Sequence, residues 1–431
     1  MTAPQSTVGT RSDAAQRERL TVHNFLAIDD AEIDINRFTI LIGPQATGKS
    51  VLARTAYFCR DLLCLHMRSF AIRQYSAAEL AEWSSRHFAE IFPPEAWASR
   101  PFEIQYGAGA SVITIRPSTA SDSTPHPIIE LSEDLAAAYE TAVELLRPIA
   151  QAARSAADSR GADDQFDAAL SQAFADTSIS GAYQRSAYVP AGRAFFAELR
   201  AAAFTLLDGR VPISRIMVEF GRQFEAYVPK PGRDAFAGVP EDVQSDVQKI
   251  LSGRYVVEGG DEYIEAPDRR TPLSFASSGQ QAAVHLLLLL LRSAYQLERH
   301  RVSYFVEEPE AHLFPTSQKL LTGIFARIYN ALEHNFVLTT HSPYILTAMN
   351  NLIMAQDVLD SQGEIVAPEI DRLVGLNRLV RYSDVSAYTI AKGTATSIMD
   401  GDVRLIGASV IDAVSDDFEG VFGELLELER T

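Results

Sequence analysis

The stretch from Thr39 to Phe58, TILIGPQATGKSVLARTAYF, constrains the chain more than any other part of the sequence. It begins as an apolar, strand-like run, turns on glycine and proline, and continues as a helix-like segment. The turn fits the pattern G-x-x-x-x-G-K-[ST] and consists of Gly43, Pro44, Gln45, Ala46, Thr47, Gly48, Lys49 and Ser50. Its glycines let backbone N–H groups curl round a phosphate, and the following helix points its positive end at the same anion. The sequence therefore predicts a phosphate-binding loop between a strand and a helix.

Two side chains of this loop suggest which phosphate compound is bound. We expect Lys49 to reach the β- and γ-phosphates of a nucleotide and the Ser50 hydroxyl to ligate Mg²⁺. The cofactors predicted in this way are ATP and Mg²⁺. The alternative is a helix-capping turn with an exposed lysine and no ligand.

Carboxylates end a second strand-like run. Residues 304–306 are followed by Glu307, Glu308, Pro309 and Glu310. We expect Glu307 near the magnesium shell, and Glu308 to polarise a water molecule for in-line attack on the γ-phosphate. An aspartate usually fills the first place, and Glu307 is one methylene longer. The alternative, a pair of surface acids at a strand end, loses weight because a phosphate-binding loop is already present.

Two further motifs also place polar residues at the end of a predicted strand or at the start of a predicted helix. Ala276-Ser277-Ser278-Gly279-Gln280 places small polar residues and a glycine at a helix start, which predicts a second anion-binding helix N-terminus. Taken alone, it would be a simple helix cap. Thr339-Thr340-His341-Ser342-Pro343 places a histidine at the end of the next strand, where it can sense a γ-phosphate. Taken alone, it would be a structural histidine.

Composition narrows the protein class. The 431 residues, 47% hydrophobic and 22% charged, allow two domains or one domain with a large insertion. No apolar run reaches the roughly 18 residues of a membrane span, and the six leucines from Leu286 to Leu291 predict a buried core helix. Cys59 and Cys64 form no disulfide framework and no zinc spacing, and the first 20 residues lack the apolar core of a secretory signal. We therefore expect a cytoplasmic protein without membrane contact.

The net charge of the chain indicates whether nucleic acid is an expected binding partner. The formal charge of −18 argues against broad nonspecific nucleic-acid binding, because phosphate contacts need clustered Lys and Arg. A local basic patch stays open, so nucleic acid remains a partner that the charge does not indicate.

Local patterns divide the chain into four parts. Alternating apolar residues predict strands over 19–43, glycines within 102–117 predict a β-hairpin, and Ala/Leu/Glu-rich segments predict helices over 131–176 that break near Pro148 and Gly161. The last segment, 411–430, predicts an acidic amphipathic helix. The predicted parts are a flexible tail over 1–18, a lobe with a β subdomain over 19–129, a mainly helical insertion over 130–250, and a second lobe over 251–431.

Taken together and in order, the motifs resemble the ABC-type ATPase heads of the SMC/RecF/OLD group. GPQATGKS looks like Walker A, ASSGQ like the LSGGQ signature, FVEEPEAHLFP like Walker B, and TTHSP like the His switch. The residues of the last two motifs, FVEEPEAHLFP and TTHSP, are closest to those of OLD-family ATPases and of ATPases of bacterial two-gene anti-phage defence systems. This resemblance implies an α/β fold: an ABC-type P-loop ATPase head with an N-terminal antiparallel β subdomain and a helical insertion.

The resemblance also implies roles and partners. Two copies would form a head-to-tail homodimer, or a higher even-numbered oligomer, with ATP between Lys49 of one copy and the signature of the other. Glu308 would be the catalytic base and His341 the γ-phosphate switch, with a separate effector protein supplying the output. A Q-loop glutamine is expected, and Gln74 and Gln105 are both candidates. The signature residues that would grip the nucleotide are Ser277, Ser278, Gly279 and Gln280.

Four alternative functions compete with this interpretation. A C-terminal TOPRIM nuclease could use Asp400-Gly401-Asp402, but the preceding KGTATSIM is not the apolar strand that such a site needs. An SMC/RecF-like DNA-binding repair ATPase would need long coiled coils or a basic face. A non-catalytic nucleotide-gated scaffold is disfavoured by Glu308, and a transporter ATPase would need membrane partners.

Overall fold

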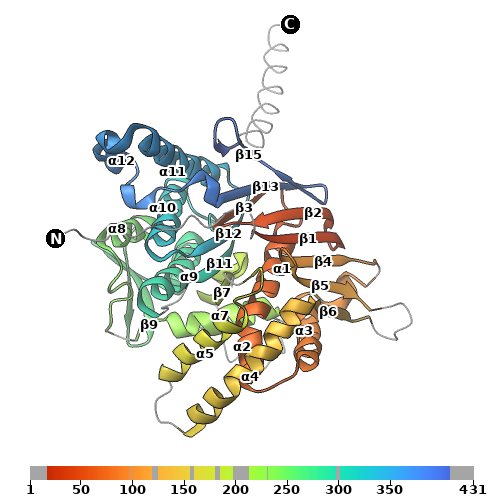
Figure 1. The fold of residues 1–431 in the computed structure, drawn as a ribbon. Helices are drawn as coiled ribbons and strands as arrows, with labels where there is room; N and C mark the ends of the chain where they lie inside the picture. The colour runs from red at the N-terminus through yellow and green to blue at the C-terminus, as the bar shows by residue number, and fades with distance from the viewer. Residues whose placement is uncertain are drawn as a thin grey trace, which may run out of the picture.

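The computed structural model has a mixed α/β fold built on one large sheet. It describes residues 17–98, 100–118, 125–155, 160–179, 185–197, 213–230, 232–297 and 301–407. Most of the predicted N-terminal tail and the predicted helix at 411–430 lie outside these residues. Within them, one 11-stranded sheet has helices on both of its faces, which confirms the predicted α/β class (Figure 1).

One half of the sheet is parallel. Its neighbouring strands, in order, are β7 (Arg185–Val189), β11 (Val302–Glu307), β12 (Asn335–Thr340), β3 (Phe38–Ile42) and β13 (Val385–Ala391). The residues of β3, β11 and β12 are buried throughout, as expected of parallel strands covered on both faces. The loops that follow these five strands therefore emerge at one edge of the sheet.

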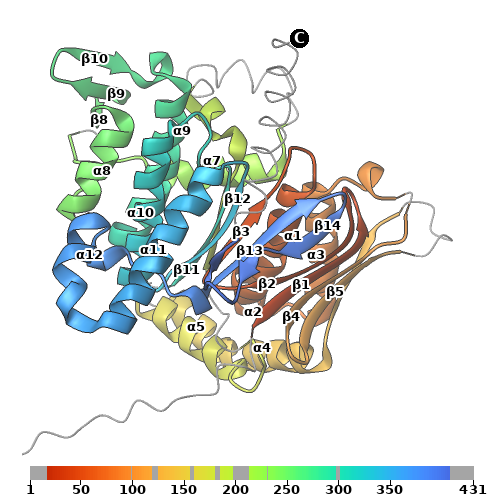
Figure 2. The ribbon, with the colours of Figure 1, turned by 90° about the horizontal axis from the view of Figure 1, so that it is seen from above.

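Two helices that carry predicted motifs lie on opposite faces of this parallel half. Ile40 and Leu338 belong to the core cluster that includes the leucines of α9 (Ser278–Arg292), and this cluster also takes in α10 (Pro315–Leu332). Leu41 and Val337, whose side chains alternate to the other face, belong to the cluster that includes α1 (Lys49–Asp61). Figure 2 shows α1 and α9 on either side of β3 and β12.

The run of leucines explains why α9 is so deeply placed. Each side chain from Leu286 to Leu291 is 0% exposed, which confirms the predicted buried helix. Around α9 lie α7 (Arg215–Tyr227), α8 (Glu241–Leu251) and a small antiparallel sheet, β8 (Arg254–Glu258), β9 (Asp261–Ala266) and β10 (Arg269–Pro272).

The other half of the sheet is mainly antiparallel. β14 (Thr394–Ser397) joins β13 to β2 (Ile28–Ile35), and antiparallel pairs then link β2, β1 (Glu18–Phe25), β4 (Glu103–Ala108), β5 (Ser111–Pro117) and β6 (Pro127–Leu131). The predicted antiparallel β-strands and the hairpin at 102–117 are therefore present, with Glu18, assigned from sequence to the tail, already in the first strand.

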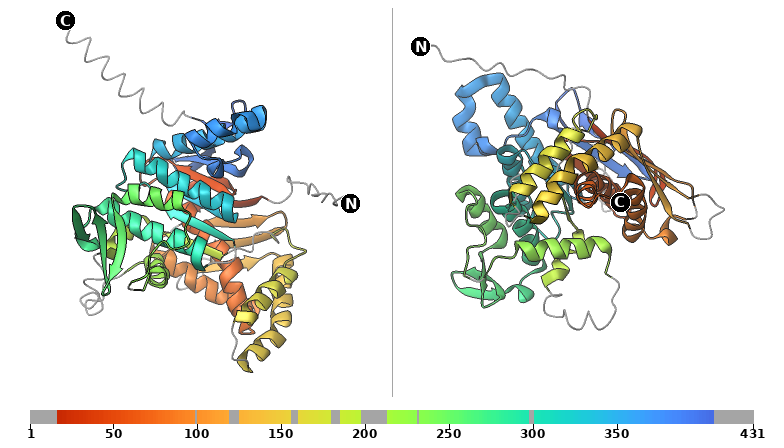
Figure 3. Two further views of the ribbon diagram at one scale, coloured as in Figure 1. Left: turned by 90° about the vertical axis from the view of Figure 1, so that its left-hand side faces the viewer. Right: turned by 60° about the horizontal axis from the view of Figure 1, so that its bottom comes forward.

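Helices pack outside this antiparallel half. They are α2 (Met67–Ile72), α3 (Ala77–Ile91), α4 (Glu133–Ser155) and α5 (Arg160–Ala173). The pair α4 and α5, drawn in yellow, lies side by side at one end of the molecule (Figure 3). The predicted break near Pro148 is wrong, because α4 continues through this residue. Burial of Val143, Leu146 and Ala150 along one stripe of α4 offsets the backbone bond that a proline removes.

The C-terminal part closes the fold. α11 (Pro343–Gln362) and α12 (Ala367–Leu373) precede β13, and β15 (Met399–Asp400) pairs with β16 (Leu405–Ile406) as a short hairpin. The Asp400 carboxylate accepts hydrogen bonds from the N–H groups of Asp402 and Val403, so this D-x-D run is the turn of the hairpin. Of the helices in the described ranges, none has the length and apolar character needed to cross a bilayer.

The predicted domain boundaries remain predictions. The segment 130–250 is mainly helical where it is described, but it also contains β7, which pairs with β11 at the edge of the main sheet. The sheet therefore runs across the segment that the sequence predicts as an insertion.

Candidate nucleotide-binding site

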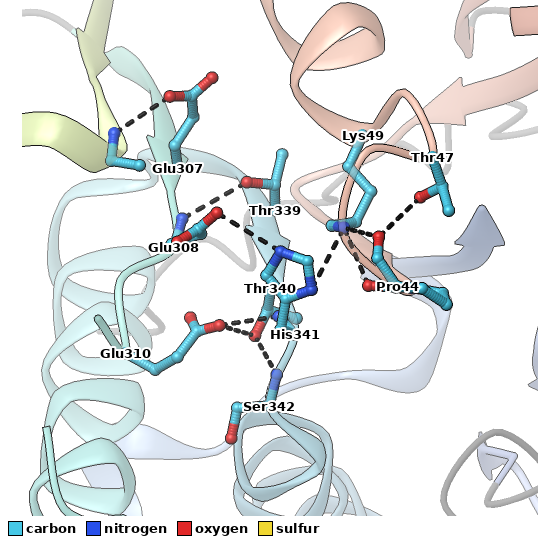
Figure 4. A network of polar contacts seen from close by, with 12 residues as sticks. Pro44, Thr47, Lys49, Glu307, Glu308, Glu310, Thr339, Thr340, His341 and Ser342 are labelled. Carbon is cyan, nitrogen blue, oxygen red and sulfur yellow. Dashed lines mark hydrogen bonds and ion pairs between the residues drawn. The ribbon is translucent and has the colours of Figure 1, made fainter. Parts of the chain in front are cut away.

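Three of the predicted motifs follow three neighbouring parallel strands. The loop 43–50 follows β3, His341 follows β12, and Glu308 follows β11. Because carboxyl ends of parallel strands share one edge, the topology brings these segments together from distant parts of the chain. Figure 4 shows the resulting cluster, with the ring of His341 between Lys49 and Glu308.

The backbone of the loop 43–50 has the conformation that its glycines permit. Gly48 has a φ of 101°, and a Cβ on Gly43 would lie 2.2 Å from the Ile390 carbonyl oxygen of β13. Helix α1 begins directly after Gly48, and no side chain caps its first N–H groups. A helix N-terminus without a side-chain cap leaves N–H donors for an anion.

Lys49 occupies the centre of the loop. Its ammonium nitrogen Nζ lies 2.8 Å from the Gly43 carbonyl oxygen, 2.7 Å from that of Pro44, and 3.4 Å from His341 Nδ1. Burial lowers the pKa of Lys49, although Glu308 and Glu310 act in the opposite direction. The loop thus encloses a cation that has no direct carboxylate partner in the described structure, which is the arrangement that an anionic ligand requires.

Glu308 and Glu310 surround His341. Glu308 Oε1 lies 3.4 Å from His341 Nε2, and Glu310 Oε1 accepts hydrogen bonds from His341 N and Thr340 Oγ1, each at 2.7 Å. Glu308 has a φ of 43°, an uncommon backbone conformation for a residue other than glycine. Its N–H donates to the Thr339 carbonyl at 2.9 Å, which ties it to β12.

Glu307, predicted from sequence as a metal ligand, has other partners in the structure. Both of its carboxylate oxygens accept from Arg54, at 2.9 and 3.2 Å, and they also accept from Tyr188 Oη at 2.6 Å and from Ala191 N at 3.0 Å. Its side chain is 2% exposed and points away from Lys49 (Figure 4). Burial raises the pKa of Tyr188, so this hydroxyl stays a donor. Direct ligation of a metal by Glu307 would require the pair with Arg54 to open.

The donor groups that remain fit Mg²⁺. Ser50 supplies a half-buried hydroxyl, and Glu308 is the half-buried acid on the Lys49 side of β11. In the described ranges, no group of three or more His, Cys, Asp or Glu side chains forms a metal-binding cluster. Mg²⁺ at nucleotide sites commonly keeps several waters and binds one or two protein oxygens plus substrate phosphates. Ser50 is thus the protein group best placed to hold it.

The signature residues form a capped helix start beside the Glu308 loop. Ser277 Oγ accepts from Gln280 N, and Gln280 Oε1 accepts from Ser277 N, so the helix cap considered as the simpler alternative is present, in the form of a capping box. A Cβ on Gly279 would lie 2.6 Å from the His312 carbonyl oxygen, so only glycine permits this approach. Ser277 and Ser278 are exposed, and no hydrogen bond or ion pair described in the structure joins residues 277–280 to 43–50.

The two glutamines considered for the Q-loop are engaged elsewhere. Gln74 donates to the carbonyls of Ala71 and Val143 and accepts from Arg147, while Gln105, on β4, donates to Glu103. Neither side chain makes a hydrogen bond to the loop 43–50 in the part of the chain that the structure describes.

Sequence analysis missed Arg54 and Tyr188. Both act on Glu307, yet they come from α1 and β7, far from it in the chain. The only signal was the residue type, since a buried carboxylate needs a cation or several donors.

Comparisons with known proteins are consistent with nucleotide chemistry over part of the chain. Residues 220–346 match the family model of the AAA ATPase domain, and this range includes Ser277, Glu308 and His341 but not the loop 43–50. No curated protein matches the sequence.

Solved structures give weak matches over most of the chain. The SMC head domain from Thermotoga maritima matches at 12% identity and a TM-score of 0.36, covering 89% of this chain and 98% of that one. An SMC head from Pyrococcus furiosus, bound to the C-terminal domain of ScpA, matches at 10% identity and a TM-score of 0.38, covering 94% and 99%. The recombination mediator protein RecF matches at 9% identity and a TM-score of 0.31, covering 89% and 99%.

The pairing of Arg54 with Glu307 leads to a stability prediction. Arg54→Met leaves the buried Glu307 carboxylate without its cation, and we expect a loss of about 2 kcal/mol, because the carboxylate keeps an uncompensated charge while Arg54 itself is partly exposed to solvent. Adding Glu307→Gln to Arg54→Met should recover part of this loss. Thermal denaturation of the single and double variants measures both effects.

A surface pair provides the control. Arg86 and Glu82 form an exposed ion pair on α3, so Arg86→Met should cost less than about 1 kcal/mol. Equal melting temperatures for Arg54→Met and Arg86→Met would contradict a structural role of the Arg54–Glu307 pair.

Proposed function

We propose that the protein binds ATP with Mg²⁺ and hydrolyses it to ADP and phosphate, as an ABC-type ATPase head of the SMC/RecF class. The observation that carries this proposal is the continuous contact from Lys49 through His341 to Glu308 across three neighbouring strand ends. It joins a phosphate-binding lysine to a carboxylate base.

In the proposed reaction each side chain has a defined task. Lys49 Nζ leaves the carbonyls of Gly43 and Pro44 to bind the β- and γ-phosphates, where N–H groups at the start of α1 also donate. Glu308 takes a proton from water as the water oxygen bonds to the γ-phosphorus and the bond to the β–γ bridging oxygen breaks. His341 donates to a γ-phosphate oxygen. Mg²⁺, when bound, supplies charge neutralisation at the phosphates.

We propose further that hydrolysis requires a second copy of the chain. Within one chain α1 and α9 cover opposite faces of the sheet, and no hydrogen bond or ion pair described in the structure joins residues 277–280 to the loop 43–50, which supports a grip by Ser277 on the nucleotide of another copy. The exposed Ser277 and Ser278 at the start of α9 are free to meet a nucleotide held by another copy. A two-fold arrangement would give each dimer two composite sites.

The proposal for the biological role rests on the residues of two motifs alone. EEPEAHLFP and THSP resemble ATPases of bacterial anti-phage systems, so we propose a nucleotide-dependent sensor or scaffold whose output comes from a separate effector protein. Protection against phage by the chain with its neighbouring gene, lost in Lys49→Ala, would support this role. Protection that survives Lys49→Ala would contradict it.

The first prediction of the proposal concerns binding. Lys49→Ala should abolish ATP binding, because the β- and γ-phosphates lose the cation at the centre of the loop. Isothermal titration calorimetry with ATP and Mg²⁺ measures the affinity, with Arg86→Ala, which removes an exposed cation on α3, as a control. ATP affinity equal to that of the parent would contradict the assignment of the loop.

A second prediction separates binding from turnover. Glu308→Gln keeps the size of the side chain but removes the proton acceptor, so we expect ATP binding to persist while hydrolysis slows by about 10²–10⁴-fold. Phosphate release under saturating ATP is the measurement. If hydrolysis continues at the parental rate, Glu308 is not the base, and Glu310 becomes the candidate.

A third prediction tests action between copies. Ser277→Arg should leave ATP binding intact but block hydrolysis, because the larger cation collides with the nucleotide site of the second copy. Mixing Ser277→Arg with Lys49→Ala should restore about one competent site per mixed dimer. ATPase rate against mixing ratio is the readout. Full activity of Ser277→Arg alone would show that this segment is only a helix cap.

A further inference from the structure

Arg193 is the largest fully buried side chain in the described structure, and it has an unusual set of partners. It lies in the short helical turn Ala191–Ala194 that follows β7, and it is 0% exposed. Its five N–H groups are all directed at main-chain carbonyls, at 2.9 to 3.3 Å: those of Pro190, Ala282, Glu307, Glu308 and Pro309. A guanidinium has five donors in a fixed fork, so this site satisfies all of them.

Four of the five carbonyls belong to segments that the proposed reaction needs. Three of them belong to the consecutive residues Glu307, Glu308 and Pro309. The fourth, that of Ala282, lies in the first turns of α9, the helix that Ser277 caps. Arg193 therefore connects the loop that carries the base to the helix that carries the signature. Its charge persists at neutral pH, because burial lowers the pKa of Arg193 only to about 10 and the nearby acids Glu310, Glu308 and Glu307 act in the opposite direction.

The backbone at Glu308 needs such support. Its φ of 43° is unfavourable for a side chain with a Cβ, and such conformations persist only where surrounding contacts hold them. Arg193 binds the carbonyls of Glu307 and Glu308, and Thr339 binds the N–H of Glu308. These contacts fix the direction in which the Glu308 side chain leaves the main chain, toward His341.

A second contact ties α9 to the same loop. The close approach of Gly279 to the His312 carbonyl leaves no room for a Cβ, so the start of α9 bears directly on the loop after Glu308. Arg193 holds the next turn of α9 at Ala282. A displacement of α9 along its axis would therefore be passed to the Glu308 backbone at two points.

We propose that Arg193 is a positioning residue that aims the Glu308 carboxylate and couples it to the signature helix, so that engagement of Ser277 by a second copy adjusts the base. This inference rests on the proposed function. The competing explanation is that Arg193 only fills and stabilises the interior between β7, β11 and α9.

A double-mutant cycle separates these explanations. Arg193→Lys keeps a buried cation but has one compact donor group, which cannot reach Ala282 and the Glu308 loop together. Arg193→Gln removes the charge. Arg292→Gln is the control, because Arg292 also donates to a main-chain carbonyl, that of Ala235 at 3.1 Å, from the opposite end of α9. ATP affinity by calorimetry and single-turnover hydrolysis are measured for each variant with Glu308 and with Glu308→Gln.

We expect Arg193→Lys to bind ATP as the parent does and to hydrolyse it about 100-fold more slowly, because a displacement of a reacting group by about 1 Å costs a rate factor of this order. In the Glu308→Gln background the same substitution should cause no further slowing, because there is no base left to misplace. Arg292→Gln should hydrolyse ATP at the parental rate.

Four results would overturn the inference. They are a parental rate in a folded Arg193→Lys or Arg193→Gln variant, an equal slowing in the Glu308→Gln background, an equal slowing in Arg292→Gln, and failure of both Arg193 variants to fold, which would assign the residue to stability alone. A parent protein that does not hydrolyse ATP would instead contradict the proposed function.

Discussion

The site depends on the parallel pairing of β7, β11, β12 and β3. Each strand ends in a segment with a different chemical role, and the register of neighbouring strands decides which segments meet. β3 delivers the loop with Lys49, β12 delivers His341, β11 delivers the carboxylates, and the turn after β7 delivers Arg193. A change of one residue in any register would exchange the two buried faces of that strand and displace its polar terminus relative to the others. Fold and site therefore have the same physical cause.

At this edge of the sheet, the two neighbouring glutamates Glu307 and Glu308 have different charged partners. Glu307 is buried and paired with Arg54, whereas Glu308, the next residue, points to the opposite side of the strand and contacts His341. A carboxylate whose two oxygens both accept hydrogen bonds inside the protein stabilises the fold, whereas a half-exposed carboxylate can accept a proton. Lys49 has no direct carboxylate partner in the described structure, and the proposed function assigns it to the phosphates.

Sequence patterns predicted what is local. The glycine loop, the helix cap at Ser277 and the leucine-rich core helix each depend on residues close together in the chain, and each is present. Predictions from these patterns were wrong or incomplete where contacts between distant parts of the chain determine the structure. Pro148 does not break α4, because burial along its apolar stripe holds the helix. Arg54, Tyr188 and Arg193 belong to no local sequence pattern, because their partners are brought near only by strand order.

The central claim is that one nucleotide is shared between the loop 43–50 of one copy and the signature segment of another. Sedimentation velocity of Glu308→Gln, with and without ATP and Mg²⁺, tests it most directly, since this variant should hold ATP without consuming it. The account predicts a change from one copy to two when ATP and Mg²⁺ are added, and no change when ADP replaces ATP. Particles of one unchanged mass in all three conditions, at ATP concentrations that saturate binding, would contradict the claim.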